Sequence, residues 1–211
     1  MSWNDIPDWS YDVTKSLLES LHLVDPVTYF HCLRVGESSR KLARSLGLNE
    51  YEQRVAEFSG IFHDIGKVGI SPTVINKPAR LSDEEYDLMK RHPEMSVKLI
   101  EPLKGTQFFA DMIPAVLHHH ERMDGRGYPE GVFGEKIPLV SRIILIADTV
   151  DAMSETRPYR KGLPIDIVYA ELKRCAGTQF DERLVKVFLE AHPTWEKEGH
   201  PETQVRLKRA A

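Results

Sequence analysis

Histidine residues are the first candidates for chemistry in this 211-residue chain, which contains nine of them. His63 is followed directly by Asp64, and the residues three, four and seven positions before His63 are small, which leaves room for a metal ion or a ligand. A single inward-facing histidine is more often a hydrogen-bonded core residue than a ligand, so no one position establishes a site. Six histidines are predicted to lie at helix ends or on inward-facing stripes: His31, His63, His92, His118, His119 and His120.

Asp148 gives the stronger indication of a metal. It lies in Arg-Ile-Ile-Leu-Ile-Ala-Asp-Thr-Val-Asp-Ala-Met, a segment that is apolar almost all round as a helix. An ionised carboxylate in such a core costs several kcal/mol unless it is paired or bound to a cation. No lysine or arginine lies within one helical turn of Asp148. A divalent cation is the simplest partner, and a hydrogen bond to the N-terminus of another helix is the alternative.

The candidate ligands are imidazoles and carboxylates without a thiolate, which suits iron, manganese or zinc and disfavours a structural zinc site. They exceed what one ion needs once water is included. A pair of ions that share a bridging carboxylate fits better, and such a pair can hold the hydroxide that attacks a phosphodiester in line. Spacing alone does not separate His118 from its two neighbours. The set comprises His31, His63, Asp64, His92, His119, His120 and Asp148.

The elements that must position these residues are all predicted to be helices, so the fold class is all-α. Pro26 follows Asp25 as in a capped helix start, and Asn49 with Glu52, like Ser82 with Glu85, matches a capping box. A short hairpin near residues 132–133 is the most β structure expected. The expected helices cover residues 10–23, 26–47, 49–66, a segment after 82, another from 93, and 111–119, 139–155, 164–176 and 181–191.

The composition indicates one globular domain. Hydrophobic residues make up 41% and charged residues 28%, and a net charge of −4 gives no general attraction to DNA, RNA or an anionic membrane. Two cysteines and a polar start without a signal-peptide pattern are compatible with a cytoplasmic protein. We expect a helical extension at 1–24, a catalytic domain at 25–191 and a charged tail at 192–211.

Ordered motifs connect the chain to a known family. His63-Asp64-Ile65-Gly66-Lys67 resembles the signature of the HD phosphohydrolase superfamily. His119-His120-Glu121 followed by Asp124-Gly125-Arg126-Gly127-Tyr128-Pro129 resembles that of its HD-GYP subgroup. Further matches, in order over residues 25–191, are His31-Cys32-Leu33-Arg34-Val35, Asn76-Lys77-Pro78, His92-Pro93, Ala147-Asp148, Arg157-Pro158-Tyr159-Arg160-Lys161 and Gly177-Thr178-Gln179-Phe180-Asp181.

The resemblance implies an HD-domain-like helical bundle that hydrolyses cyclic di-GMP to linear pGpG or GMP, with two or three metal ions, commonly iron or manganese. Carried over by position, the ligands are His31, His63, Asp64, His92, His119, His120 and Asp148, and Asp64 would bridge two ions. Members with three metals carry a glutamate four residues before the first histidine. Val27 stands there in this chain and cannot ligate, so we expect two metals.

Lys67, together with Asp64, is the expected catalytic residue, because its ammonium could neutralise phosphoryl oxygens in the transition state. Asp151 could instead orient a ligand or the water. Tyr128 could stack on a base, and basic residues could hold the second phosphate. The expected substrate-binding residues are Lys67, Tyr128, Asp151, Arg157, Arg160 and Lys161.

Two other functions compete with this interpretation. The fold could bind a cyclic dinucleotide with weak turnover and dock signalling proteins through the Gly-Tyr-Pro loop. It could also hydrolyse cyclic GMP-AMP, since the motifs favour a cyclic dinucleotide over a triphosphate without choosing the base. The oligomeric state stays open, with a dimer as one possibility.

Overall fold

The computed structural model of the chain describes residues 6–155 and 161–195. Across these two ranges the chain forms helices and no strand, apart from one isolated bridge between Ala176 and Phe180. The predicted all-α single domain is confirmed. The hairpin considered near residues 132–133 does not form, and a short 3-10 turn, η4 (Gly134–Lys136), follows instead.

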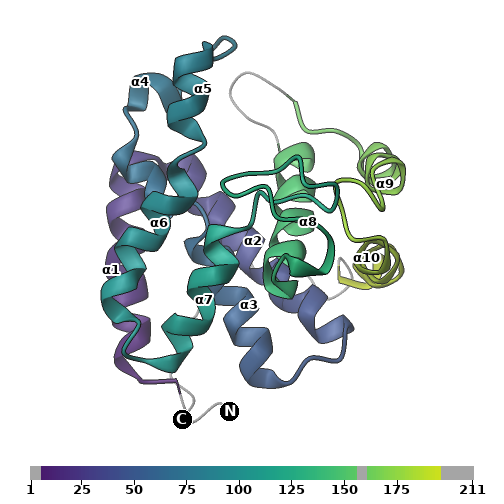
Figure 1. Cartoon of the computed structure of the whole chain (residues 1–211), viewed down its shortest axis with the longest axis horizontal. Helices are drawn as coiled ribbons and strands as arrows, with labels where there is room; N and C mark the ends of the chain where they lie inside the picture. Colours follow the sequence, from purple (N-terminus) through teal and green to yellow (C-terminus); the bar gives the residue numbers. More distant parts are fainter. Residues whose placement is uncertain (1–5, 156–160, 196–211) are drawn as a thin grey trace.

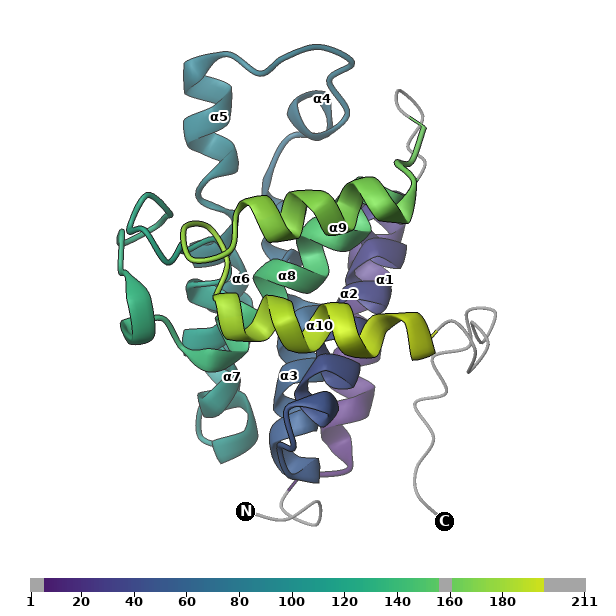
Figure 2. The same ribbon diagram turned by 90° about the vertical axis from the view of Figure 1, so that its right-hand side faces the viewer.

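The helices pack around a central pair, α2 and α3, as Figures 1 and 2 show. On one side lie α1, α6 and α7, and on the other lie α8, α9 and α10. The α4–α5 segment projects from the end of the molecule, and neither of its helices has a buried residue. The elements are α1 (Trp9–Val24), α2 (Pro26–Ser45), α3 (Glu50–Phe62), η2 (Ile65–Gly69), α4 (Pro72–Ile75), α5 (Asp83–Met89), α6 (His92–Ile100), η3 (Glu101–Leu103), α7 (Gln107–Leu117), α8 (Leu139–Ser154), α9 (Ile165–Arg174) and α10 (Glu182–Trp195).

Side-chain caps define several helix starts as the sequence predicted. The Asp25 carboxylate accepts hydrogen bonds from the backbone N–H groups of Val27 and Thr28 at the start of α2. Asn49 and Glu52 form a reciprocal capping box on α3, and the pair at residues 82 and 85 forms another on α5. None of the helices in the described ranges is long and apolar enough to cross a membrane.

Some helix boundaries differ from the expectation, as at the start of α7, which is Gln107 rather than residue 111. Helix α3 ends at Phe62 rather than near Gly66, because the chain tightens there into the 3-10 helix η2. Helix α10 continues to Trp195, whose side chain is buried and packs edge-on against Phe188. Helix α1 has nearly the expected bounds, and its Leu18 and Leu21 side chains are buried.

Two glycines set the distance between α2 and α3. A Cβ atom added to Gly60 would lie 2.9 Å from Gly36 Cα, and one added to Gly36 would lie 2.8 Å from the Glu57 carbonyl oxygen. Real Cβ atoms do not approach backbone so closely, so the two helices meet with no side chain between them. This contact brings His31 on α2 beside His63 at the end of α3, with ring centroids 5.2 Å apart.

A third close approach joins η2 to the start of α6. The Gly66 N–H donates to Ser96 Oγ at 2.8 Å, and the same hydroxyl donates to the His63 carbonyl at 2.8 Å. A Cβ atom on Gly66 would lie 2.3 Å from the His92 carbonyl oxygen and 2.4 Å from Ser96 N. The backbone around His63 and the backbone that carries His92 are therefore held against each other at Gly66.

We predict that Gly66→Ala lowers the free energy of unfolding by about 3 kcal/mol, the upper end of the usual cost of overpacking, because two backbones must separate. Urea denaturation of the metal-free protein measures this change. Gly105→Ala is the matched control, since nothing lies within 4 Å of a Cβ atom there. Equal stability of the two variants would contradict the close packing of η2 on α6.

Candidate metal centre

The structure brings the seven predicted ligand residues together at the centre of the helical bundle. His31 comes from α2, and Asp148 comes from α8. The other five lie where a helix ends or begins: His63 and Asp64 after α3, His92 at the first position of α6, and His119 and His120 after α7. Five of the seven side chains are buried, and His120 and Asp148 are partly buried.

The ligand atoms form two groups that face each other. One consists of His31, His63 and Asp64, and the other of His92, His119 and His120, and within each group the atoms lie within 4.8 Å of one another. Asp64 lies between them. Its Oδ1 is 3.1 Å from His92 Nε2, whereas its Oδ2 is 3.5 Å from His63 Nε2 and 3.7 Å from His31 Nε2. One carboxylate thus faces both groups.

Backbone carbonyls orient three of the imidazoles. The Nδ1 atoms of His63, His92 and His119 lie 2.6, 2.8 and 2.7 Å from the carbonyl oxygens of the residues three positions before them. Those residues, Gly60, Met89 and Val116, lie in the last turns of α3, α5 and α7, where carbonyls lack a partner within the helix. With Nδ1–H donating to a carbonyl, each Nε2 carries the lone pair and points into the cluster.

The donor set fits divalent cations. His63 Nε2 and Asp64 Oδ1 are buried, and neither has a hydrogen-bond partner among the described residues. Buried polar atoms normally have a hydrogen-bond partner, so two neighbouring atoms without one indicate a site for a bound ion. Nitrogen and carboxylate donors without thiolate match the ions expected from the sequence.

Burial keeps four imidazoles in the neutral form that binds metal. It lowers the pKa of His92 to about 3 and that of His120 to about 4, and it also lowers the pKa values of His63 and His119. His31 differs. Burial lowers its pKa, but the hydrogen bonds from its ring to Asp148 and Asp151 outweigh burial and raise the pKa to about 9.

The carboxylates are held ionised. Burial raises the pKa of Asp64, yet the charges of Lys67 and the surrounding imidazoles bring it well below its usual value. The pKa of Asp148 is also lowered, because the hydrogen bond from His31 at 3.1 Å outweighs burial. Asp148 therefore has an imidazole partner, His31, in the protein. The sequence around Asp148 did not predict this pairing, because His31 lies on a different helix.

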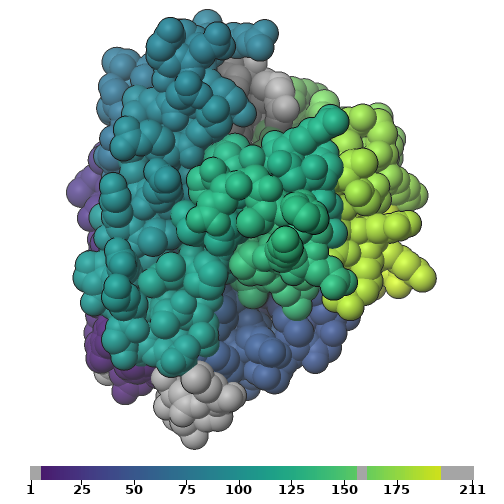
Figure 3. Space-filling view, viewed as in Figure 1, coloured from purple at the N-terminus to yellow at the C-terminus, as the bar shows by residue number. Residues whose placement is uncertain are grey.

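Two further predicted residues adjoin the cluster. Lys67 Nζ lies 2.5 Å from Asp64 Oδ2. The Tyr128 ring stacks on His120, with centroids 4.7 Å apart and an angle of 28° between the planes. Tyr128 belongs to the α7–α8 connection, which runs in front of α8 in Figure 1. The space-filling view from the same side has green residues at the centre of this face (Figure 3). Lys161 is exposed, and the predicted substrate contacts Arg157 and Arg160 lie outside the described residues.

The structure distinguishes the three consecutive histidines, which spacing could not. His119 and His120 belong to a ligand group, whereas His118 turns away. Its Nδ1 lies 2.9 Å from the Pro114 carbonyl and its Nε2 3.1 Å from Glu130. His118 is the C-cap of α7, whereas His119 and His120 follow the helix.

Asp151 and Arg34 form a pair that sequence reasoning found only in part. The Asp151 Oδ2 atom lies 2.6 Å from His31 Nδ1, and both carboxylate oxygens accept hydrogen bonds from the Arg34 guanidinium. Since both oxygens are engaged within the protein, the geometry favours an orienting role for Asp151 over a contact with substrate. Arg34 was missed as a functional residue, although its position one turn after His31 in the sequence was a usable signal.

An all-helical bundle around a histidine–aspartate cluster defines the class of metal-dependent hydrolases to which the sequence pointed. A family model described as HD domain matches residues 15–184, and the chain belongs to this family, within its HD-GYP subgroup. Membership implies dependence on a divalent metal, and the two ligand groups are where such ions would bind.

Several curated relatives are similar to this chain. It is 36% identical over 190 residues to the cyclic di-GMP phosphodiesterase response regulator RpfG of Xanthomonas campestris. That alignment covers 89% of this chain and 50% of RpfG. It is 35% identical over 156 residues to the 3′3′-cGAMP-specific phosphodiesterase 3 of Vibrio cholerae, covering 74% of this chain and 33% of that protein. The chain thus spans half or less of the length of these relatives.

A solved structure supports the fold. The HD domain of the Listeria monocytogenes phosphodiesterase PgpH, in complex with cyclic-di-AMP, superposes with a TM-score of 0.62 at 20% identity. The match covers 90% of this chain and 99% of that one. At this identity the likeness concerns the fold alone.

We predict that His119→Ala lowers the divalent metal content by about one equivalent per chain, because it removes one of three donors from a ligand group. His118→Ala is the matched control, since the neighbouring ring faces Glu130 instead, and it should keep the wild-type content. Elemental analysis of anaerobically purified protein measures both. Retention of full metal by the His119 variant would exclude His119 as a ligand.

Proposed function

We propose that this chain is a metal-dependent phosphodiesterase that hydrolyses cyclic di-GMP to linear pGpG, GMP or both. The observation that carries the proposal is the buried cluster in which one carboxylate, Asp64, faces two groups of imidazole ligands. The names of the relatives support the reaction, since several are cyclic di-GMP phosphodiesterases.

The proposed cofactor is a pair of divalent ions, iron or manganese. His31, His63, Asp64 and Asp148 would hold one ion, and Asp64, His92, His119 and His120 the other. The presence of two ligand groups and the valine at position 27, whose side chain cannot ligate, both support two ions rather than three. When bound, such a pair activates water and neutralises the charge of a phosphodiester under attack.

The protein groups have separate parts in this proposal. Asp64 joins the two halves of the site, and its position between the ligand groups supports that role. Lys67 would supply positive charge to the phosphoryl oxygens, supported by its ammonium at the edge of the same carboxylate. The Tyr128 ring, stacked on His120, offers a surface for a base, and Arg157, Arg160 and Lys161 would hold the second phosphate.

A second substrate has a specific observation in its favour. Three of the curated relatives are named for 3′3′-cGAMP, and one of them is 35% identical to this chain. The two substrates share the sugar–phosphate ring and differ in one base, so assays with both decide between them. Docking of signalling proteins on the Gly-Tyr-Pro loop and a cytoplasmic location stay predictions from the sequence.

We predict that Asp64→Ala reduces hydrolysis of cyclic di-GMP to background, because the variant loses the carboxylate that both ligand groups share. Chromatography of the products from iron- or manganese-loaded protein measures the loss, with 3′3′-cGAMP assayed in parallel. Asp87→Ala, which removes an exposed carboxylate paired with Lys90, should retain wild-type turnover. Normal hydrolysis by the Asp64 variant would end the proposal.

We predict that Lys67→Gln lowers kcat by roughly 100- to 1,000-fold, the cost of losing one charge-stabilising group, while the metal content is retained. Steady-state kinetics and elemental analysis on the same preparation separate the two effects. Lys104→Gln, at an exposed lysine that directly follows η3, controls for the loss of a positive charge. Wild-type kcat in the Lys67 variant would remove Lys67 from the catalytic residues.

A further inference from the structure

Four of the candidate ligand histidines have a hydrogen-bond partner at Nδ1 among the described residues, and of these four only His31 lies in the interior of a helix. It is the sixth residue of α2, where each backbone carbonyl accepts a hydrogen bond from the helix itself. His63, His92 and His119 use the free carbonyls at helix ends to fix their rings. His31 has no such carbonyl within reach, so its orientation must come from another element.

Helix α8 supplies that orientation through Asp151. The His31 Nδ1 atom lies 2.6 Å from Asp151 Oδ2, which leaves Nε2 toward Asp148 at 3.1 Å and toward Asp64 at 3.7 Å. A carboxylate behind a ligand imidazole fixes the tautomer and raises its basicity. The His31 ring is fixed only if the Asp151 carboxylate is itself fixed. A carboxylate held by a single hydrogen bond can rotate.

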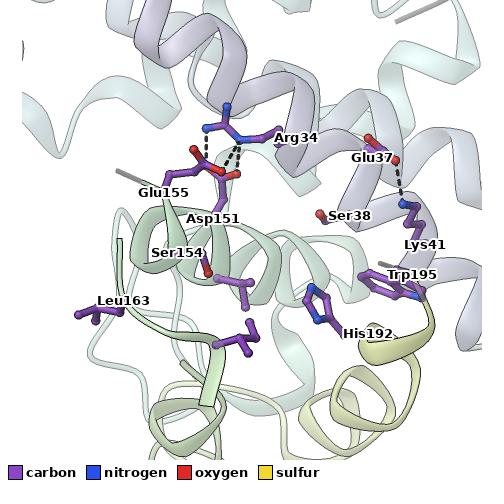
Figure 4. A pocket seen from close by; sticks show the side chains of 12 residues that line it. Arg34, Glu37, Ser38, Lys41, Asp151, Ser154, Glu155, Leu163, His192 and Trp195 are labelled. Carbon is purple, nitrogen blue, oxygen red and sulfur yellow. Dashed lines mark hydrogen bonds and ion pairs between the residues drawn. The ribbon is translucent and has the colours of Figure 1, made fainter. Parts of the chain in front are cut away.

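Arg34 prevents rotation of the Asp151 carboxylate. Its Nε donates to Asp151 Oδ1 at 2.5 Å and its terminal nitrogen to Oδ2 at 3.0 Å, the two-point contact that fixes a carboxylate in its plane. The guanidinium also lies 3.7 Å from Glu155. Figure 4 shows the Arg34 side chain directed at both carboxylates. Two residues of α2 therefore contact the end of α8. His31 contacts Asp148 and Asp151, and Arg34, one turn later, contacts Asp151 and Glu155.

We infer that Arg34 is a positioning residue for the metal centre: it holds Asp151, and Asp151 holds the His31 ring with Nε2 directed at the ion. The inference rests on the proposed function, since it assumes that His31 is a ligand. Arg34 itself touches neither the ligand groups nor Asp148 in the contacts that the described residues make, so its effect on metal must pass through Asp151.

A cavity beside Arg34 supplies both a control and a means of rescue. It has a volume of about 210 Å³ and is bordered by Arg34, Lys41, Asp151, Glu155 and Trp195, among others (Figure 4). Lys41 lies on the same wall, two turns along α2, but its ammonium pairs with Glu37 on its own helix at 2.8 Å. Replacing Lys41 therefore removes a positive charge from the same cavity without releasing Asp151.

The test compares Arg34→Ala, Arg34→Lys and Lys41→Gln for metal affinity, by competition of metal-free protein with a chromophoric chelator for manganese. We expect Arg34→Ala to weaken the affinity for at least one ion by roughly 10- to 100-fold, the usual cost of losing a group that orients a ligand. Arg34→Lys should restore little, because lysine cannot make the two-point contact. Lys41→Gln should bind as the wild type does.

A second measurement separates positioning from a loss of packing. Guanidinium ion at millimolar concentration, which the cavity can admit, should recover part of the metal affinity of Arg34→Ala and leave Lys41→Gln unchanged. If Arg34→Ala does not fold, as circular dichroism would show, the lysine variant decides the question in its place. Affinity within twofold of wild type in a folded Arg34 variant overturns the inference. Failure of the wild type itself to bind divalent metal overturns the proposed function instead.

Discussion

A carboxylate can be buried only where positive charge or hydrogen-bond donors compensate it, and the interior of this fold is organised around that requirement. Asp64 is 2% exposed, and its oxygens lie among Lys67 and three imidazoles. The protein supplies part of the compensation, but His63 Nε2 and Asp64 Oδ1 have no hydrogen-bond partner within residues 6–155 and 161–195. Binding of divalent ions and stability of this region are therefore linked, since any ligand that prefers the folded state stabilises it.

Helix length contributes to the site as much as residue type does. Helices α3, α5 and α7 end where their last carbonyls can accept a hydrogen bond from an imidazole, so groups left unpaired by helix termination orient His63, His92 and His119. A helix one turn longer would occupy those carbonyls. The His31 ring, inside α2, needs the side chains of α8 for the same purpose.

Local signals predicted the helices well, because caps such as Asp25 and the Asn49–Glu52 box act within a few residues. They failed at the end of α3, where the chain tightens after Phe62 to present His63 and Asp64. Residue chemistry and motif order gave the ligand candidates, but the split between His118 and its neighbours depends on how α7 ends. The bond between Arg34 and Asp151 joins residues 117 positions apart, which no periodicity in the sequence reveals.

The contact between Gly36 and Gly60 has a consequence for which ions the scaffold can accommodate. Because the backbones of α2 and α3 already touch there, a cation of smaller radius cannot draw these helices together. Adaptation to ionic size must come from rotation of the side chains, or from movement of the segments that carry His92 and His119. If the two groups hold the proposed ions, exchange of one metal for another would leave the group of His31, His63 and Asp64 in place and displace the group of His92, His119 and His120.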